Sequence, residues 1–128
     1  MIKHLSKIDF NPNKYKLITS VPLHKDKLKT RGYNQSQLLS KLLSNHFKIP
    51  SKDDIIENTN IRPSQTKLPK EQREKNTEGI FVVKKNLKNK NIILVDDIFT
   101  TGSTVSACAR ALREKQAGNI TIITLSKT

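Results

Sequence analysis

The chain has 128 residues, with 24 Lys or Arg against 11 Asp or Glu and a formal net charge of +13. This length predicts one domain over residues 1–128, and the single cysteine excludes a disulfide framework or a cysteine zinc site built from this chain alone. The N-terminus lacks the apolar run of a signal peptide, and no apolar run is long enough to cross a bilayer, so we expect a cytoplasmic protein without a membrane span.

The basic charge is concentrated in two segments. Residues 1–32 hold eight Lys or Arg against two Asp, and residues 62–90 hold nine Lys or Arg against three Glu. Such segments attract polyanions, which include nucleic acid, anionic membranes and phosphorylated small molecules. The alternative is a lysine-rich composition that serves solubility alone.

The first half of the chain predicts one strand and one long helix. Residues 15–21 are β-branched or apolar and predict a buried strand that stops at Pro22, and residues 22–33 are interpreted as a basic loop. From Asn34 to Pro50 the apolar residues recur at helical spacing. The expected buried stripe of this helix is Leu38, Leu39, Leu42, Leu43 and Phe47.

The middle of the chain is polar and has no sustained period. Residues 51–79 predict a long mobile loop with short strands at its root, and long loops in compact domains often serve as lids or binding loops. A short strand is expected at 80–83, followed by a turn-rich link.

The second half predicts a strand, a helix and a strand. Residues 92–95 are apolar on both faces, as in a central parallel strand. A helix is expected to begin after Gly102 and to stop at Gly118, and a last strand is expected over 119–125. The expected buried stripe of the helix is Val105, Cys108, Ala109 and Leu112. These elements predict an α/β fold with a mostly parallel sheet flanked by helices.

The segment "IILVDDIFTTGST" at 92–104 ends an apolar run in two adjacent carboxylates, Asp96 and Asp97. Ligands of such sheets bind at the carboxyl ends of the strands, where the two carboxylates can accept hydrogen bonds from hydroxyl groups. The turn that follows offers the free N–H groups and the positive dipole end of a helix, which favour a phosphate. Its residues are Thr100, Thr101, Gly102, Ser103 and Thr104. A ribose 5-phosphate presents this combination of two hydroxyls and one phosphate.

Three alternatives compete with a ribose-phosphate site. The magnesium-holding strand of a P-loop NTPase would need an upstream G-x-x-x-x-G-K-S/T, and no glycine in this chain precedes a Lys. In receiver domains a similar segment comes first, whereas only 31 residues follow Asp97 here. The third alternative is an ordinary helix start capped by Ser or Thr, which would need one such residue rather than four around a glycine.

The segment at 92–104 resembles the phosphoribosyl-pyrophosphate signature of the type I phosphoribosyltransferases. Two further segments, "VPLHKDKLKTRGYNQSQLL" at 21–39 and "QTKLPKEQREKNTEGIF" at 65–81, resemble the ComF family of competence-associated, phosphoribosyltransferase-like proteins. The resemblance covers the chain from about residue 15 to the C-terminus. It implies the fold of a type I phosphoribosyltransferase.

The resemblance also implies roles for individual residues. Asp96 and Asp97 would hold the ribose hydroxyls, and residues 100–104 would hold the 5-phosphate. Pyrophosphate would bind to residues drawn from both basic segments: Lys25, Lys29, Arg31, Gly32 and Arg73. Mg²⁺ is implied as a cofactor that is held through the ligand and not directly by the protein. The alternative for Arg31 is that, together with Asn34, it holds the loop in front of the helix.

The implied activity is that of a phosphoribosyltransferase linked to competence and DNA uptake. The alternative is a non-catalytic module that senses phosphoribosyl pyrophosphate or binds single-stranded DNA during transformation. Competence-machinery proteins and a second copy of the chain are further candidate partners. Two departures bear on these expectations. Fuller ComF-like chains begin with a cysteine zinc ribbon, so this chain is a short form or a fragment. Thr100 stands where hypoxanthine-guanine phosphoribosyltransferases carry an Asp, so no general base is named.

Overall fold

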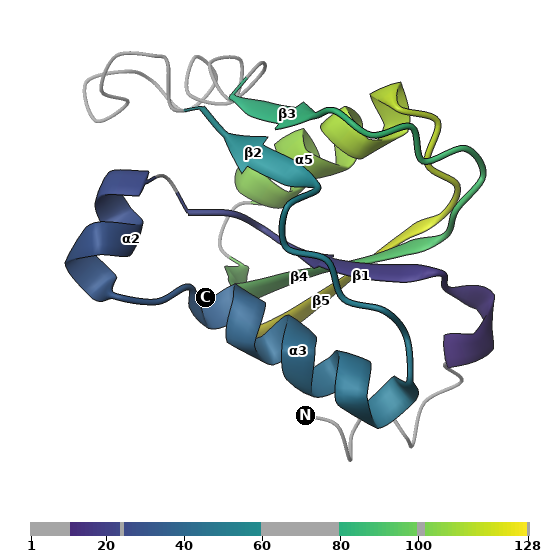
Figure 1. Cartoon of the computed structure of the whole chain (residues 1–128), viewed down its shortest axis with the longest axis horizontal. Coiled ribbons are helices and arrows are strands. Elements are labelled where there is room, and N and C mark those ends of the chain that lie inside the picture. The colour runs from purple at the N-terminus through teal and green to yellow at the C-terminus, as the bar shows by residue number, and fades with distance from the viewer. Residues whose placement is uncertain (1–10, 24, 60–79, 100–101, 128) are drawn as a thin grey trace.

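The computed structural model describes residues 11–23, 25–59, 80–99 and 102–127 (Figure 1). It confirms the expected class, a parallel sheet flanked by helices. The elements in chain order are η1 (Pro12–Lys14), β1 (Leu17–Ser20), α2 (Lys25–Arg31), α3 (Gln35–Phe47), β2 (Ile56–Asn58), β3 (Phe81–Val83), β4 (Ile92–Phe99), α5 (Ser103–Glu114) and β5 (Ile120–Lys127). No helix in these ranges is both long and apolar enough to pass through a membrane.

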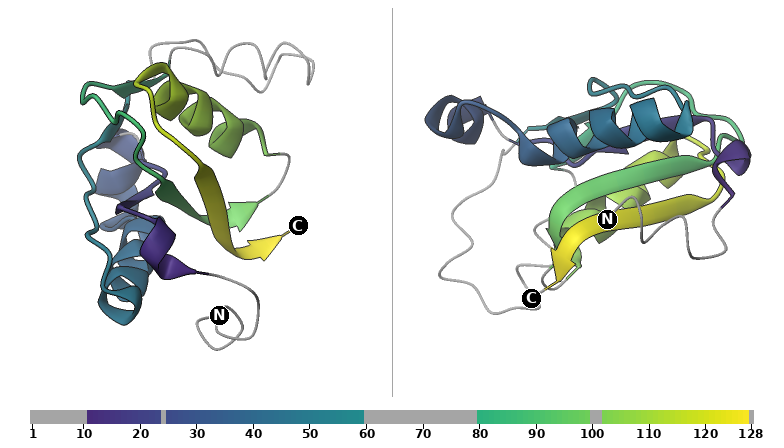
Figure 2. Two further views of the ribbon diagram at one scale, coloured as in Figure 1. Left: turned by 90° about the vertical axis from the view of Figure 1, so that its right-hand side faces the viewer. Right: turned by 90° about the horizontal axis from the view of Figure 1, so that it is seen from below.

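The main sheet has three strands in the order β1-β4-β5, and all of them run parallel. Helix α3 covers one face of the sheet and α5 covers the other, so that the domain has three layers (Figures 1 and 2). The second sheet consists of β2 and β3, which pair antiparallel. The alternation of strands and helices in the sequence predicts this arrangement, because a helix carries the chain from one parallel strand back to the start of the next.

Strand β4 is the centre of the core. Residues 92–95 are completely buried, because side chains on one face pack under α3 and those on the other face pack under α5. Ile93 and Val95 share a cluster with Leu43 of α3, whereas Ile92 and Leu94 share a cluster with Leu112 of α5. The four-residue apolar run thus predicted a strand that is covered on both sides.

The buried face of α3 differs from the expected leucine stripe. Leu43 is fully buried, but Leu38 and Leu42 are 54% and 53% exposed. Two serines, Ser36 and Ser40, are buried in their place. Ser40 lies against the chain at 50–52, which bonds to the outer edge of β1 and brings the Ser51 hydroxyl to 3.2 Å from that of Ser40. Ser36 lies against β4, where its hydroxyl bonds to Asp96 and Asp97. Small residues fit this close approach, and their hydroxyls have partners, so burying them costs little.

The predicted basic loop at 22–33 is wrong in part, because residues 25–31 form helix α2. Lysine is a good helix former, and an exposed helix needs no apolar stripe, so the pattern gave no helical period. The helix is followed by Gly32, whose φ of 80° lies in the left-handed region and whose N–H donates to the Leu28 carbonyl at 2.7 Å. Glycine takes up this conformation without strain.

Strand β4 continues beyond the expected end at Val95. Its pairing with β1 stops at Ser20↔Val95, but its pairing with β5 continues to Phe99↔Lys127. Asp96 and Asp97 are therefore part of the strand, not of a loop after it. The last strand, β5, accordingly ends at Lys127 rather than at 125.

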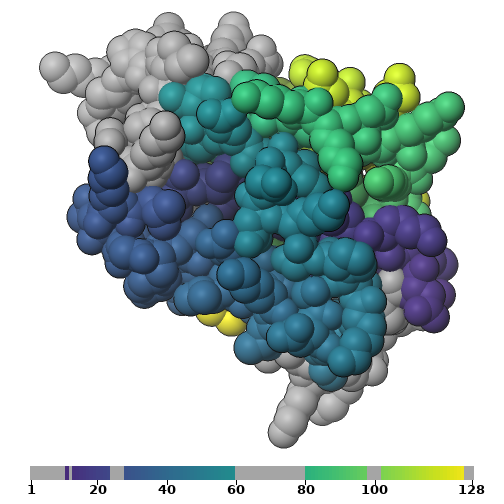
Figure 3. All heavy atoms as spheres, viewed as in Figure 1, coloured from purple at the N-terminus to yellow at the C-terminus, as the bar shows by residue number. Residues whose placement is uncertain are grey.

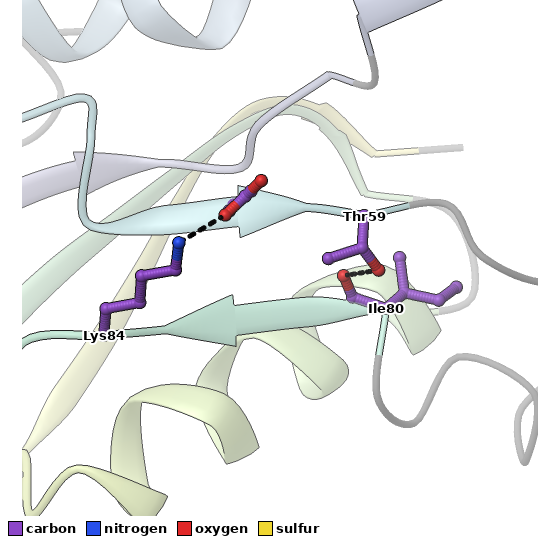
Figure 4. A network of polar contacts seen from close by, with 4 residues as sticks. Thr59, Ile80 and Lys84 are labelled. Atoms are coloured by element: carbon purple, nitrogen blue, oxygen red, sulfur yellow. Dashed lines mark hydrogen bonds and ion pairs between the residues drawn. The ribbon is translucent and has the colours of Figure 1, made fainter.

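Strands β2 and β3 flank residues 60–79, which lie outside the described residues. The Thr59 hydroxyl donates to the Ile80 carbonyl at 2.9 Å, and Lys84 Nζ lies 3.4 Å from Glu57 Oε2 (Figure 4). Ile55 and Ile56 are buried in the core. The mobility expected for 51–79 stays a prediction.

Asn91 holds the strands together at the amino end of the sheet, opposite to their carboxyl ends. Its side chain donates to the Lys14 carbonyl at 3.0 Å and accepts from the Asn119 N–H at 2.9 Å. Gly118 was expected to stop α5, but the helix ends at Glu114. Glycine is required at 118 for another reason: an added Cβ would lie 2.6 Å from Asn91 Oδ1 and 3.2 Å from the Asn89 carbonyl oxygen.

Candidate functional site

Asp96 and Asp97 lie where β1 leaves the sheet. The Val21 N–H makes the last bond to β4, at 2.9 Å from the Val95 carbonyl oxygen, and the chain then turns away toward α2. The two carboxylates follow directly in β4. Beyond this point one edge of β4 is no longer covered by a neighbouring strand, which is the position at which ligands of parallel sheets bind.

Ser36 connects the two acidic residues to α3. Its hydroxyl donates to Asp96 Oδ1 at 3.4 Å and accepts from the Asp97 N–H at 3.1 Å, and the residue is only 4% exposed. The sequence reading did not single out Ser36. The available signal was Asn34, a good N-cap residue, which places Ser36 in the first turn of the helix that follows.

Asn34 fixes the start of α3 above the end of β1. Its side-chain oxygen accepts from the N–H groups of Ser36 and Gln37 at 3.0 and 3.3 Å, and its amide donates to the Val21 carbonyl at 3.2 Å. The alternative role considered for Asn34, holding the loop in front of the helix, is thereby confirmed. The side chain of Arg31 is exposed, and its share in this role stays a prediction.

The carboxyl of Asp96 is held in an environment that disfavours its charge. Burial, together with the neighbouring charge of Asp97, raises the pKa of Asp96 from 3.8 to about 6. The Asp97 N–H and the Ser36 hydroxyl oppose this rise because they donate to the charged form. A carboxylate that is poorly solvated in this way gains from a bound hydroxyl or cation, and such groups cluster at functional sites.

We expect Ser36→Ala to loosen this arrangement. The change removes a donor to Asp96 and leaves the Asp97 N–H without its side-chain partner, so it should cost about 1–2 kcal/mol of unfolding free energy and raise the pKa of Asp96 further. Urea unfolding and an NMR titration of the Asp96 carboxyl would measure both effects. Ser106→Ala, on the exposed face of α5, is the control and should change neither. An unchanged Asp96 pKa in Ser36→Ala would contradict the assigned bond.

The N-terminus of α5 follows β4 at the same end of the sheet. Gly102 is the N-cap residue with φ 81° and ψ −2°, and a glycine has no side chain that could make a capping bond. The N-cap position is thus not taken by a Ser or Thr, as an ordinary capped start would require. The first turn contains Ser103 and Thr104 and no acidic residue, so it keeps the positive potential of a helix N-terminus. Thr100 and Thr101 lie outside the described residues.

Cys108 lies in the second turn of α5 and is fully buried. Burial, and to a smaller degree the charge of Asp96, raises the pKa of its thiol above the ordinary value. The thiol therefore stays protonated and packs in the core as expected. Because the charge of Asp96 contributes to this rise in the pKa of Cys108, α5 lies against the end of β4 that carries Asp96.

The structure describes only some of the residues that were expected to bind pyrophosphate. Lys25 begins α2 and Arg31 ends it, Lys29 and Arg31 are exposed, and Gly32 follows. Figure 1 and the right-hand view of Figure 2 show α2 at the end of the sheet toward which β4 and β5 point. The structure thus brings α2 to the same end of the sheet as the carboxylates. Arg73 lies outside the described residues.

Comparison with known proteins now decides the family. Residues 34–127 match the family of the phosphoribosyl transferase domain, and this range contains Ser36, both carboxylates and α5. The chain belongs to the phosphoribosyltransferase domain family. The fold of this phosphoribosyltransferase domain is also that of a purine phosphoribosyltransferase from Pyrococcus horikoshii, with a TM-score of 0.56 at 20% sequence identity, over 98% of this chain and 66% of that one.

The relatives of this phosphoribosyltransferase domain confirm the resemblance to the ComF family. It is 36% identical to the competence protein ComFC of Bacillus subtilis, over 91% of this chain and 47% of the relative. It is 35% identical to competence protein F of Haemophilus influenzae, over 76% of this chain and 44% of the relative. It is 31% identical to the DNA utilization protein YhgH of Escherichia coli K12, over 87% of this chain and 49% of the relative. The chain thus spans about half the length of these relatives.

Proposed function

We propose that this domain binds phosphoribosyl pyrophosphate at the carboxyl end of β4. The observation that carries the proposal is the pair Asp96 and Asp97, with the raised pKa of Asp96, directly before a helix N-terminus that begins at a left-handed glycine. The carboxylates would accept from the 2- and 3-hydroxyls of the ribose. The turn ending in Gly102, Ser103 and Thr104 would hold the 5-phosphate, because the helix start offers N–H donors and positive potential.

The pyrophosphate group would be neutralised by the basic residues on and beside α2. Lys29 and Arg31 are exposed at the same end of the sheet, and the proposal extends to Lys25, Gly32 and Arg73. A pyrophosphate carries several negative charges, so that each added cation lowers the free energy of the bound state and of the leaving group.

The donor set at the site fits Mg²⁺ that is bound mainly through the ligand. Carboxylate oxygens suit this ion, which usually keeps several waters and binds through one or two carboxylates together with substrate phosphates. Within the described ranges, no group of three His, Cys, Asp or Glu side chains could hold a metal by itself. When bound, Mg²⁺ would supply positive charge that offsets the negative charges of the ligand and of Asp96 and Asp97, the residues that would lie beside it.

The reaction we propose is displacement of pyrophosphate from C1 of the ribose by a nucleophile. The bond from C1 to the pyrophosphate oxygen breaks, a bond from C1 to the nucleophile forms, and the electron pair leaves with pyrophosphate. The residues of this chain would position the ribose through Asp96 and Asp97 and stabilise the departing charge from α2. We place this reaction in the cytoplasm, as the sequence analysis expected.

A second candidate is a non-catalytic role in transformation, in which the same site senses phosphoribosyl pyrophosphate or the basic surface binds single-stranded DNA. Two observations favour it. Several relatives are competence or DNA utilization proteins, and the chain carries a net charge of +13. Competence-machinery proteins and a second copy of this chain would be the partners in that role.

Calorimetric titration of phosphoribosyl pyrophosphate, with and without Mg²⁺, tests the site. We expect Mg²⁺-dependent binding in the micromolar range, and a loss of at least about tenfold, or about 1.4 kcal/mol, in Asp96→Asn/Asp97→Asn. Glu114→Gln removes a negative charge from an exposed position outside the site and should retain the wild-type affinity. Absence of binding to the folded wild type would refute the proposal. Salt-dependent binding of a dT oligonucleotide would then support the second candidate.

A further inference from the structure

A second cluster of charged residues lies outside the site already described. A surface cavity of about 440 Å³ is lined by Ser51, Lys52, Asp54, Ile55, Lys84 and Lys85. Its volume is within the range of small-ligand sites. Residues 51–55 lead into β2 and residues 84–85 follow β3, so the cavity lies between two segments that are distant in the sequence. These segments face the viewer side by side in Figure 3, where 51–55 is teal and 84–85 is green.

The floor of the cavity is fixed by the backbone. The Lys52 N–H donates to the Ile18 carbonyl at 3.0 Å, and Ser51 is bridged to Ile18 on the outer edge of β1. Ile55 is 5% exposed and packs in the core. On the other side Lys84 and Lys85 directly follow the buried Val83. The cationic side chains therefore project from backbone that the core holds in place.

The lysines gather without enough opposing charge. Lys52 and Lys85 both line the cavity, and the neighbouring Lys52 side chain, together with the charge of Lys90, lowers the pKa of Lys85. Asp54 opposes the effect, but it is the smallest of the influences on Lys85. Lys84 pairs with Glu57 at 3.4 Å, and Asp54 is the carboxylate that acts on Lys85 among the described residues. Like charges this close repel, and a bound anion would remove that repulsion.

We propose that this lysine cavity is a second anion site, separate from the carboxyl end of β4, which binds a phosphate group between Lys52 and Lys85. Phosphate matches the observations because it offers several oxygen acceptors with two or more negative charges in a space that one cavity can enclose. Lysine binds phosphate as a point charge. Lys52, Lys85 and Lys90 together supply positive charge and need no fixed bidentate geometry. The phosphate could belong to a free oligophosphate or to the backbone of a nucleic acid strand, and these two sources share this chemistry.

Residue-specific NMR separates this cavity from the site at Asp96. Inorganic pyrophosphate without Mg²⁺, and separately a dT oligonucleotide, would be titrated into the ¹³C-labelled full chain while the lysine Cε resonances are followed. We expect the resonances of Lys52 and Lys85 to shift together and the pKa of Lys85 to rise when the anion is bound. Shifts with pyrophosphate alone would assign a free oligophosphate, and shifts with the oligonucleotide alone would assign a phosphodiester backbone.

A charge-matched pair of variants provides the control. Lys52→Gln/Lys85→Gln should weaken the interaction followed at Lys84 and Lys90 by at least about fivefold, because two of the three facing cations are lost. Lys41→Gln/Lys115→Gln removes the same charge from exposed positions on α3 and after α5 and should leave it unchanged. Equal weakening in both variants, or unmoved Lys52 and Lys85 resonances with both anions, would overturn the proposal and leave only the general attraction of a basic protein for anions.

Discussion

Asp96→Asn is expected to stabilise the folded domain at neutral pH by about 1–2 kcal/mol. The folded state raises the pKa of Asp96 from 3.8 to about 6, so folding favours the protonated carboxyl. The stabilisation that this provides is complete below pH 3.8 and is lost as the pH rises through about 6. A pKa difference of about two corresponds to ~3 kcal/mol, and partial contact with solvent screens the effect to the smaller value.

Urea unfolding of the wild type and of Asp96→Asn between pH 4.5 and 7.5 measures this effect. The advantage of the variant should be smallest at the acidic end, should grow as the pH rises toward 6, and should level off above about 6. Asparagine keeps the shape of the side chain and can still accept from Ser36, so the comparison isolates the charge. Asp97→Asn is the companion variant, because removing its charge should lower the pKa of Asp96. A pH-independent difference between wild type and Asp96→Asn would show that charge burial is not the cause.

The same substitution should weaken binding of phosphoribosyl pyrophosphate, since the proposed role of Asp96 is to accept from a ribose hydroxyl. An increase in stability together with a loss of binding would identify Asp96 as a residue retained for function at a cost in stability. Binding should accordingly also weaken as the pH falls below about 6, because protonation removes the accepting charge of Asp96.

Leu43→Ala is expected to cost about 2–5 kcal/mol of unfolding free energy, which is a large part of the 5–15 kcal/mol typical of a domain. Leu43 is fully buried against β4, where its loss would leave a cavity between α3 and the sheet. Leu42 directly precedes it in the same helix, but the Leu42 side chain is 53% exposed. Leu42→Ala should therefore change stability by less than about 0.5 kcal/mol. Similar costs for the two variants in urea unfolding would contradict the orientation of α3.

The sequence predicted the parts of the fold that depend on long apolar runs. The run at 92–95 is buried on both faces by two helices, and the stripe from Val105 to Leu112 covers one of those faces as expected. The orientation of α3 could not be predicted, because four leucines at helical spacing do not reveal that the chain at 50–52 approaches Ser40. Helix α2 was missed for a related reason: a short exposed helix has no apolar face to give a period.

The candidate site was predicted in its composition more than in its geometry. Two adjacent carboxylates before a Thr-Thr-Gly-Ser-Thr turn indicated a ligand site and its position in the sheet. The local sequence could not show that β5 keeps Asp96 and Asp97 within the strand, because that depends on pairing with residues 120–127. Nor could it show Ser36, which is 60 residues from Asp96 and becomes its neighbour only when α3 packs on the sheet.

The bonds of Asn91 have a consequence for how the sheet opens. They join the segment before β1, the start of β4 and the start of β5 at the amino end of the sheet. At the carboxyl end, β1 no longer pairs with β4 at Asp96. Local unfolding should therefore begin at the carboxyl end and stop before it reaches Asn91. The residues around Asp96 and Asp97 can then change in sequence while the bonds of Asn91 at the far end of the sheet keep the strands aligned. The end of the sheet that lies away from Asp96 would then limit how far the sequence can vary, since a Cβ added at Gly118 would lie 2.6 Å from Asn91 Oδ1.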